Sequence, residues 1–192
     1  MLVRLGQEVQ EVPRRLTAPD LRDDAIRLEP LGRKLAHDMR WMLECDGDTA
    51  RFTYIPSEPD QAFLDRWLAR YEEGWKTGER AGFAVRDGSG DAVGFAAFVR
   101  LDLELQQGEI GYVIAPSARG KGVATRSVDL LTRWGLDELG LERIELRIDS
   151  ENAGSERVAE RAGYTKEGVL RNVGFKEGLR TDVGIWSRLT TD

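Results

Sequence analysis

The chain has 192 residues, of which 41% are hydrophobic and 32% are charged, and its formal net charge is −6. This length and composition predict one soluble globular domain with a substantial core. The negative charge argues against a protein that binds nucleic acid through its overall charge, and it favours a cationic partner such as an amine.

The sequence offers little for a membrane or a metal. No apolar run reaches the roughly 18 to 20 residues that a spanning helix needs. Charges interrupt the first fifteen residues where a signal peptide needs an apolar stretch, so we expect a cytoplasmic protein. The single cysteine, Cys45, excludes an internal disulfide, and with the single histidine, His37, it gives no basis for a metal site.

The N-terminal part of the chain predicts an extension followed by the start of a domain. Residues 1–24 are polar and contain two prolines, so we interpret them as an extension, in which residues 2–12 alternate enough to form an extra edge strand. The domain then spans residues 25–192. It begins with a predicted strand at 26–31 and a helix at 33–43, and residues 44–60 form a turn-rich connection.

Regular patterns continue through the middle of the chain. Residues 61–75 place Phe63, Trp67, Leu68 and Tyr71 at helical spacing. Two strands, "AGFAVRD" and "DAVGFAAFVRL", are joined by a glycine-containing hairpin turn, and "GEIGYVIAP" predicts a further strand.

The stretch "YVIAPSARGKGVATRSVDLL", residues 112–131, has the composition of an anion site. A buried strand is stopped by Pro116, Gly120 and Gly122 let the backbone approach a ligand, and a helix follows. Its unpaired N–H groups and the neighbouring cations favour a phosphate or pyrophosphate. The P-loop pattern fails here, because Ala115 stands at its first glycine, and the dinucleotide fingerprint fails at Thr125.

The C-terminal part predicts a strand at 142–149, a short helix at 152–161 and two final strands at 166–175 and 180–189. Strands with interspersed helices indicate an α/β fold with a mixed, twisted sheet.

"RGKGVA", with Arg119, Gly122 and Ala124 in the pattern R-x-x-G-x-A, resembles the acyl-CoA pyrophosphate loop of the GCN5-related N-acetyltransferases (GNAT). Residues 135–172 resemble the downstream half of the same family, most closely its RimJ/RimL-type branch, and the similarity extends over about residues 26–189. The resemblance implies a sheet flanked by helices, in which the fourth and fifth strands splay apart to admit the pantetheine arm.

The resemblance also implies roles for individual residues. A backbone N–H near Val113 or Ile114 faces the thioester carbonyl, loop amides cradle the pyrophosphate with help from the Arg119 and Lys121 side chains, and Asn152 contacts pantetheine. The predicted cofactor-binding residues are Val113, Ile114, Arg119, Gly120, Lys121, Gly122, Val123, Ala124, Thr125 and Asn152.

Two residues are candidates for proton transfer. Glu109 opens the strand that leads to the loop, where relatives carry a general base, and a solvated strand-end carboxylate is the competing interpretation. Many relatives protonate the leaving thiolate with a tyrosine, but Ala159 occupies that position. Ser155 then becomes the candidate on the thiol side, against a helix cap formed with Asn152. Tyr164 matches a core position of the family.

The acceptor is an amine, for which Trp41, Phe52 and Tyr54 are candidate walls or, equally, core aromatics. We expect an acetyl-CoA-dependent transferase that acts on a protein N-terminal amine of the ribosomal-protein type. A small amine such as an antibiotic, polyamine or amino acid is the alternative, and a non-catalytic acyl-CoA-binding module is a third option. We expect no nucleic-acid, membrane or metal partner, and a homodimer is left open.

Overall fold

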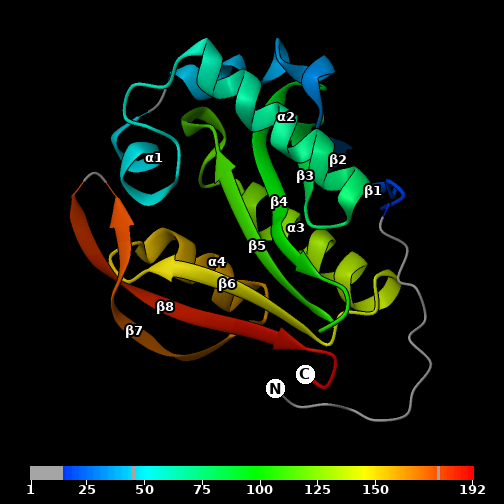
Figure 1. The fold of residues 1–192 in the computed structure, drawn as a ribbon, viewed down its shortest axis with the longest axis vertical. Helices are drawn as coiled ribbons and strands as arrows, with labels where there is room; N and C mark the ends of the chain where they lie inside the picture. The colour runs from blue at the N-terminus through cyan, green and yellow to red at the C-terminus, as the bar shows by residue number, and fades with distance from the viewer. Residues whose placement is uncertain (1–14, 45, 177) are drawn as a thin grey trace.

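This computed structural model describes residues 15–44, 46–176 and 178–192 (Figure 1). Within these residues the strands form one eight-stranded sheet in the order β1-β2-β3-β4-β5-β6-β8-β7. All neighbouring strands in it are antiparallel except β5 and β6. The strands are β1 (Leu21–Arg22), β2 (Ile26–Pro30), β3 (Ala81–Asp87), β4 (Ala92–Asp102), β5 (Gln107–Ile114), β6 (Arg143–Asp149), β7 (Thr165–Lys176) and β8 (Leu179–Leu189).

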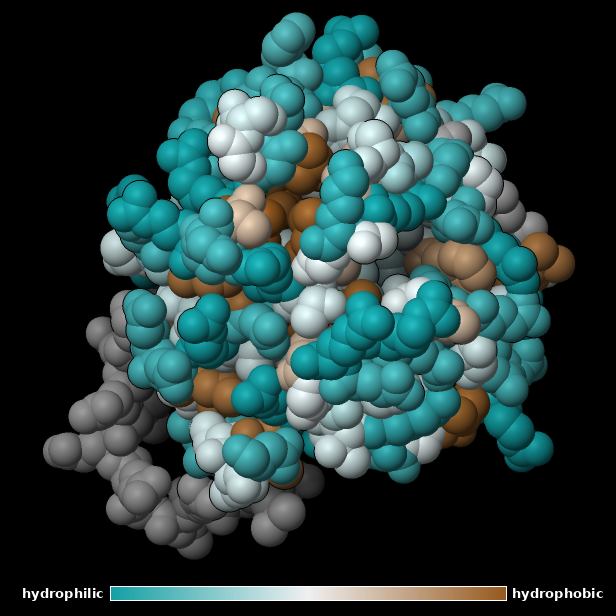
Figure 2. Space-filling view, turned by 180° about the vertical axis from the view of Figure 1, so that it is seen from behind, coloured by the Kyte–Doolittle hydropathy of each residue, from teal (hydrophilic) through white to brown (hydrophobic). Residues whose placement is uncertain are grey.

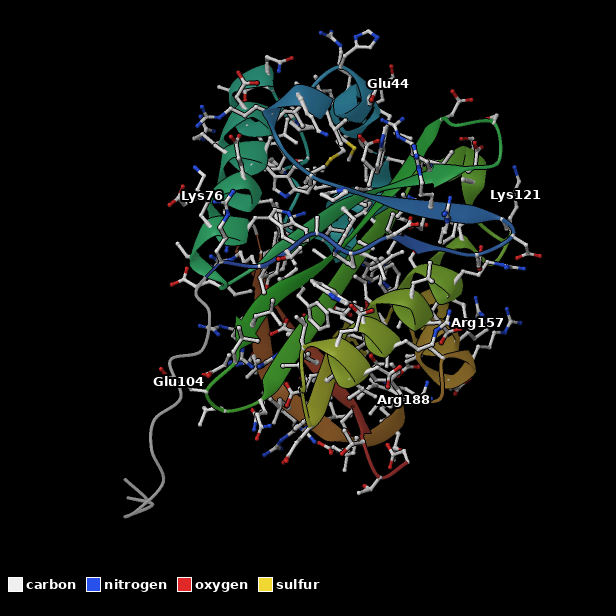
Figure 3. The ribbon with its side chains drawn as sticks, turned by 90° about the vertical axis from the view of Figure 1, so that its right-hand side faces the viewer. Glu44, Lys76, Glu104, Lys121, Arg157 and Arg188 are labelled. Carbon is white, nitrogen blue, oxygen red and sulfur yellow. The ribbon has the colours of Figure 1, made fainter. Side chains whose placement is uncertain are left out.

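Helices cover both faces of the sheet. One face packs against α3 and α4 through a core that includes Phe98, Leu131 and Ile144, and the other packs against α2 through Leu64, Leu68 and Phe95. Figure 3 shows α2 on one side of the strands and α3 and α4 on the other. The α-helices are α1 (Gly47–Phe52), α2 (Gln61–Thr77), α3 (Val123–Arg133) and α4 (Ala153–Arg161), and α3 continues as a π-helical turn, Trp134–Glu138.

Local sequence signals explain several boundaries. Helix α2 begins after Asp60, whose carboxylate accepts from the Phe63 amide at 2.6 Å, and it ends at Gly78, where the left-handed backbone (φ 76°) suits glycine. The β3–β4 turn contains Gly90 at φ 93°. The two final strands and the alternating strand β6 also lie within about a residue of their predicted positions.

Strands β5 and β6 pair over only three residues and then diverge. Gln107, Gly108 and Glu109 pair in parallel with residues 143–145, and no pairing follows between the described parts of these two strands. Figure 1 shows the two strands meeting at one end and separating towards α1. The splay that the resemblance implied is therefore present.

Two regions differ from the prediction. The helix expected at 33–43 is wrong, because two 3-10 helices, Arg33–Leu35 and Asp38–Leu43, occupy this region. Leu35, Met39 and Met42 do bury one face at helical spacing, but neither segment begins with a side-chain cap that would satisfy the first amides of a longer α-helix. The second region, residues 44–60, was expected to be a turn-rich connection but contains helix α1. Asp46 caps this helix, because its carboxylate accepts from the Thr49 amide at 2.9 Å.

The described part of the N-terminal extension packs onto the domain. Leu16 is buried and its amide donates to the Trp75 carbonyl at 3.0 Å, while Leu21–Arg22 pairs with β2 at the sheet edge. The edge strand predicted at 2–12 lies outside the described residues. No helix in the described part of the chain is long and apolar enough to cross a membrane. The face that carries α3 and α4 is largely hydrophilic, with small separate hydrophobic areas (Figure 2).

Candidate active site

A cleft of about 540 Å³ lies where β5 and β6 diverge. Its size is typical of a small-molecule site. Four pieces of chain contribute to its walls: α1, the end of β5, the loop at residues 119–122 (the glycine loop) with the start of α3, and α4. The cleft is lined by Asp48, Thr49, Phe52, Thr53, Tyr112, Val113, Ile114, Ala118, Arg119, Gly120, Gly122, Val123, Ala124, Thr125, Glu151, Asn152, Ala153, Gly154, Ser155, Arg157, Val158 and Arg161.

The glycine loop presents backbone to the cleft. Gly120 and Gly122 have φ angles of 74° and 79°, in the left-handed region that favours glycine, and a Cβ on either would meet no atom within 4 Å. Helix α3 starts directly after Gly122, so the amides of its first turn, Val123 to Thr125, have no acceptor within the helix. Open backbone, glycines and a helix start therefore fit a pyrophosphate group.

The Arg119 side chain has partners within the protein. Its guanidinium donates to both carboxylate oxygens of Asp46, at 2.6 and 2.9 Å, to the Thr49 hydroxyl at 2.8 Å and to the Ile114 carbonyl at 3.0 Å. Its amide donates to the Pro116 carbonyl at 3.3 Å. Arg119 thus ties the glycine loop to α1, and its assistance to the loop amides in holding the pyrophosphate stays a prediction.

The contacts with Arg119 lower the pKa of Asp46. The guanidinium and the Thr49 hydroxyl hold the pKa of the Asp46 carboxyl well below its usual range, because both stabilise the carboxylate. Asp48 adds a further contact with Arg119 at 3.7 Å. The N-terminal end of α1 is therefore fixed by charge to the loop.

Helix α1 is also tied to the opposite side of the cleft. The Lys176 ammonium, on β7, donates to the carbonyls of Ala50, Thr53 (2.7 Å) and Ile55 (2.6 Å) at the end of α1. Arg51 pairs with Glu151, beside α4. Figure 1 shows α1 between the end of β5 and the β7–β8 hairpin. Helix α1 bridges the open end of the splay.

Cationic side chains lie near the glycine loop and α4, on the α3 and α4 side of the sheet. Figure 3 shows Lys121 and Arg157 on the same side of the molecule, both pointing outwards. Arg157 and Arg161, both on α4, line the cleft. Together with the α3 N-terminus they make this end suitable for phosphates.

The ladder between β4 and β5 decides which amide faces the gap. The Ala115 amide donates to the Val93 carbonyl at 2.9 Å, so alternate residues of β5, including Val113, direct their amides towards β4. The amides of Tyr112 and Ile114 point the other way, into the gap beside β6. Of the two amides predicted to face the thioester carbonyl, that of Ile114 points into the gap.

Glu109 lies at the closed end of the splay, outside the residues that line the cleft. It shares a sheet face with Glu145, its register partner on β6. Its side chain is 22% exposed and lies 3.9 Å from the Arg100 guanidinium. Burial raises the pKa of Glu109, and the neighbouring Arg147 and Arg100 oppose this rise. A raised pKa suits a base that works near neutral pH.

Asn152 and Ser155 lie at the start of α4, on the cleft. The Asn152 side-chain carbonyl accepts from the Ser155 amide at 3.0 Å, so the capping interpretation of this pair is confirmed. Both residues also line the cleft, where their remaining polar atoms are available to a ligand. Tyr164 is buried and shares a 2.6 Å hydrogen bond with Thr132, consistent with its predicted core position.

The three acceptor-wall candidates separate. Phe52 lines the cleft, with the Arg51 guanidinium over its ring. Trp41 packs against the core beneath α2, and Tyr54 is 95% exposed; neither lines the cleft. Tyr112, which the sequence reasoning passed over, does line it. Its alternation with Ile110 and Ile114 was the signal that it faces α3 and α4.

The family model described as "Acetyltransferase (GNAT) domain" matches residues 26–165. The spermidine N(1)-acetyltransferase of Escherichia coli (strain K12) is 27% identical over 154 residues, which are 80% of each chain. The ribosomal-protein-serine acetyltransferase of the same organism is 26% identical over 99 residues, 52% of this chain and 55% of that protein.

A solved structure shows the same fold. The ribosomal-protein-S5-alanine acetyltransferase from Vibrio fischeri matches with a TM-score of 0.80 and 18% identity, over 91% of this chain and 98% of that one. The family match covers most of the chain, including the strand, the glycine loop and α4 that form the cleft. The chain therefore belongs to the GNAT acetyltransferase family and is an N-acetyltransferase.

Proposed function

We propose that this enzyme transfers the acetyl group of acetyl-CoA to the N-terminal amine of a protein, of the kind that ribosomal-protein acetyltransferases modify. The observation that carries the proposal is the pairing of carboxylates around the site. Asp48 contacts Arg119, Glu151 contacts Arg51, and the Glu145 carboxylate accepts from Arg143 at 2.9 Å.

A polyamine carries several positive charges and needs several carboxylates to receive them. Each of the carboxylates named above lies beside an arginine, whereas the ion pair of Glu109 among the described residues spans 3.9 Å to a mostly exposed Arg100. One weakly compensated carboxylate matches one ammonium group. This supports an acceptor with a single reacting amine, such as a protein N-terminus.

The geometry supports approach from two sides. Acetyl-CoA would lie on the α3 and α4 side, with its pyrophosphate on the glycine loop and its pantetheine arm between β5 and β6. The amine would come from the α2 side, which Glu109 faces. Glu109 would take a proton from the amine, and the Ile114 amide would stabilise the thioester oxygen as it becomes negative.

An acceptor panel tests the proposal. Peptides with a free N-terminal serine or alanine are compared with spermidine, and the release of coenzyme A thiol is followed for each. We expect the peptides to have the higher kcat/KM. A matched peptide with a blocked N-terminus and an internal lysine should give no product by mass spectrometry.

A small amine is the second candidate, because the match to the spermidine enzyme covers more of this chain than the match to the ribosomal-protein enzyme. If spermidine reacts with a higher kcat/KM than every peptide, the proposed acceptor is wrong. The cytoplasmic location stays a prediction from the sequence.

A further inference from the structure

The Tyr112 side chain lines the cleft, and its hydroxyl has no hydrogen-bond partner among the described residues. This hydroxyl is buried, yet the side chain lines the cleft at the end of β5 that pairs with β4 and not with β6. A buried hydroxyl without a partner is costly, and a ligand bound in the cleft can supply the missing partner.

The position of this hydroxyl relates it to the thiol side of the reaction. Tyr112 projects from β5 onto the sheet face that carries α3 and α4, where it packs with the core beside Ile110 and Ile114. Ser155, at the start of α4, lies close enough to the phenol to lower the pKa of Tyr112 slightly against the effect of burial, although the two hydroxyls do not have hydrogen-bond geometry. Glu109 faces the opposite side of the sheet. Tyr112 and Glu109, the two candidate proton-transfer groups, therefore lie on opposite faces of the sheet.

The α4 position where many relatives carry their tyrosine cannot supply this proton, because Ala159 occupies it and is fully buried. Other phenols are placed elsewhere: Tyr164 is bonded to Thr132, Tyr71 packs under α2 and Tyr54 is exposed. Among the described tyrosines, Tyr112 alone lines the cleft.

We propose that Tyr112 is the acid of this enzyme, donating its phenolic proton to the sulfur of coenzyme A as the thioester breaks. The inference rests on acetyl transfer and deepens the proposed function, but it holds for any amine acceptor. Burial raises the pKa of Tyr112 to about 12, which keeps the phenol protonated at neutral pH, as a proton donor must be.

The step balances as follows. The amine nitrogen forms a bond to the thioester carbonyl carbon, the C–S bond of the tetrahedral intermediate breaks, and its electron pair goes to sulfur. The phenolic O–H of Tyr112 gives its proton to that sulfur, which yields the free thiol. The amine loses a proton to Glu109 or to water, and the resulting tyrosinate regains a proton from solvent, with the Ser155 hydroxyl beside it as a relay. The net products are the amide and coenzyme A.

Two substitutions test this role. Tyr112→Phe removes the proton and keeps the ring, so kcat should fall by about 10²-fold or more, while acetyl-CoA affinity measured by calorimetry changes little. Tyr164→Phe is the matched control, since it removes a buried hydroxyl outside the cleft and should leave kcat within about threefold of the wild type. Thermal melting of both variants establishes that they are folded.

Replacement of Tyr112 by fluorinated tyrosines separates an acid from a packing or binding group. Fluorine lowers the phenol pKa, so activity should return relative to Tyr112→Phe, and the alkaline limb of the kcat–pH profile should move to lower pH with each added fluorine, in step with the phenol pKa. A packing role would leave that limb in place. An unmoved limb, or a folded Tyr112→Phe enzyme with near wild-type kcat, overturns the proposal. The kinetic assays of the Tyr112 variants use whichever amine the wild-type enzyme acetylates. A wrong choice of acceptor class is therefore detected by the acceptor panel, and it does not affect the test of Tyr112.

Discussion

Replacement of Glu109 by glutamine should separate activity from stability. The substitution keeps the size of the side chain and removes the basic form. A general base contributes about 10² to 10⁴ in rate, which corresponds to about 2.7 to 5.4 kcal/mol of barrier. Because 22% of the Glu109 side chain is exposed, water can reach the site and accept the amine proton in part of the turnovers of the variant. We therefore expect kcat/KM for the amine to fall by about 10² to 10³.

The stability of the same variant should move in the other direction. Burial raises the folded-state pKa of Glu109 above its unfolded value, so the ionised carboxylate costs stability at pH values above the folded pKa. That cost fades as the pH falls through the folded pKa and is absent below the unfolded pKa. Glutamine removes it, so Glu109→Gln should melt at the same or a higher temperature than the wild type at pH 7, and the difference should shrink as the pH is lowered.

The assay combines steady-state kinetics from pH 6 to 9 with thermal melting of the same samples. The acidic limb of the wild-type kcat/KM profile should flatten in Glu109→Gln, while acetyl-CoA binding is retained. Glu145→Gln is the matched control, because it makes the same change at the register partner of Glu109 on a carboxylate bonded to Arg143. It should lose stability and keep kcat/KM within about threefold. Wild-type kcat/KM in Glu109→Gln across this range would refute the base assignment.

Three further predictions concern the frame of the site. Gly122→Val places a branched side chain at a left-handed position, a strain of about 1 to 2 kcal/mol, and projects it towards the cleft, so acetyl-CoA should bind more weakly by calorimetry in a protein that still folds. Glu167→Gln should lower the melting temperature at pH 7, because Arg143 and Ser187 lower the Glu167 pKa to about 2; the loss should vanish as the pH falls from about 4 towards 2. Lys176→Met removes the donor to the carbonyls at the end of α1, so amide hydrogen exchange there should accelerate while exchange in α3 is unchanged.

Local patterns in the sequence determined much of the fold. The spacing of Leu64, Leu68 and Tyr71 places one face of α2 in the core, and the alternation of β6 buries Ile144, Leu146 and Ile148, because helical and strand periodicities are properties of a short segment. The glycine loop was equally readable, since a left-handed backbone beside a helix start requires glycine at particular positions. Resemblance to a family then supplied the splay, which no local pattern contains.

Only the tertiary structure decided how the site is assembled. Arg119 reaches Asp46 across 73 residues of sequence, and neither residue carries a local signal of the other. The ladder between β4 and β5 selects the Ile114 amide over that of Val113, because hydrogen-bond direction alternates along a paired strand. Tyr112 gains its place near Ser155 from the packing of α4 on the sheet face opposite α2. Such contacts depend on how distant elements pack in three dimensions, whereas periodicity and turn chemistry act within a few residues.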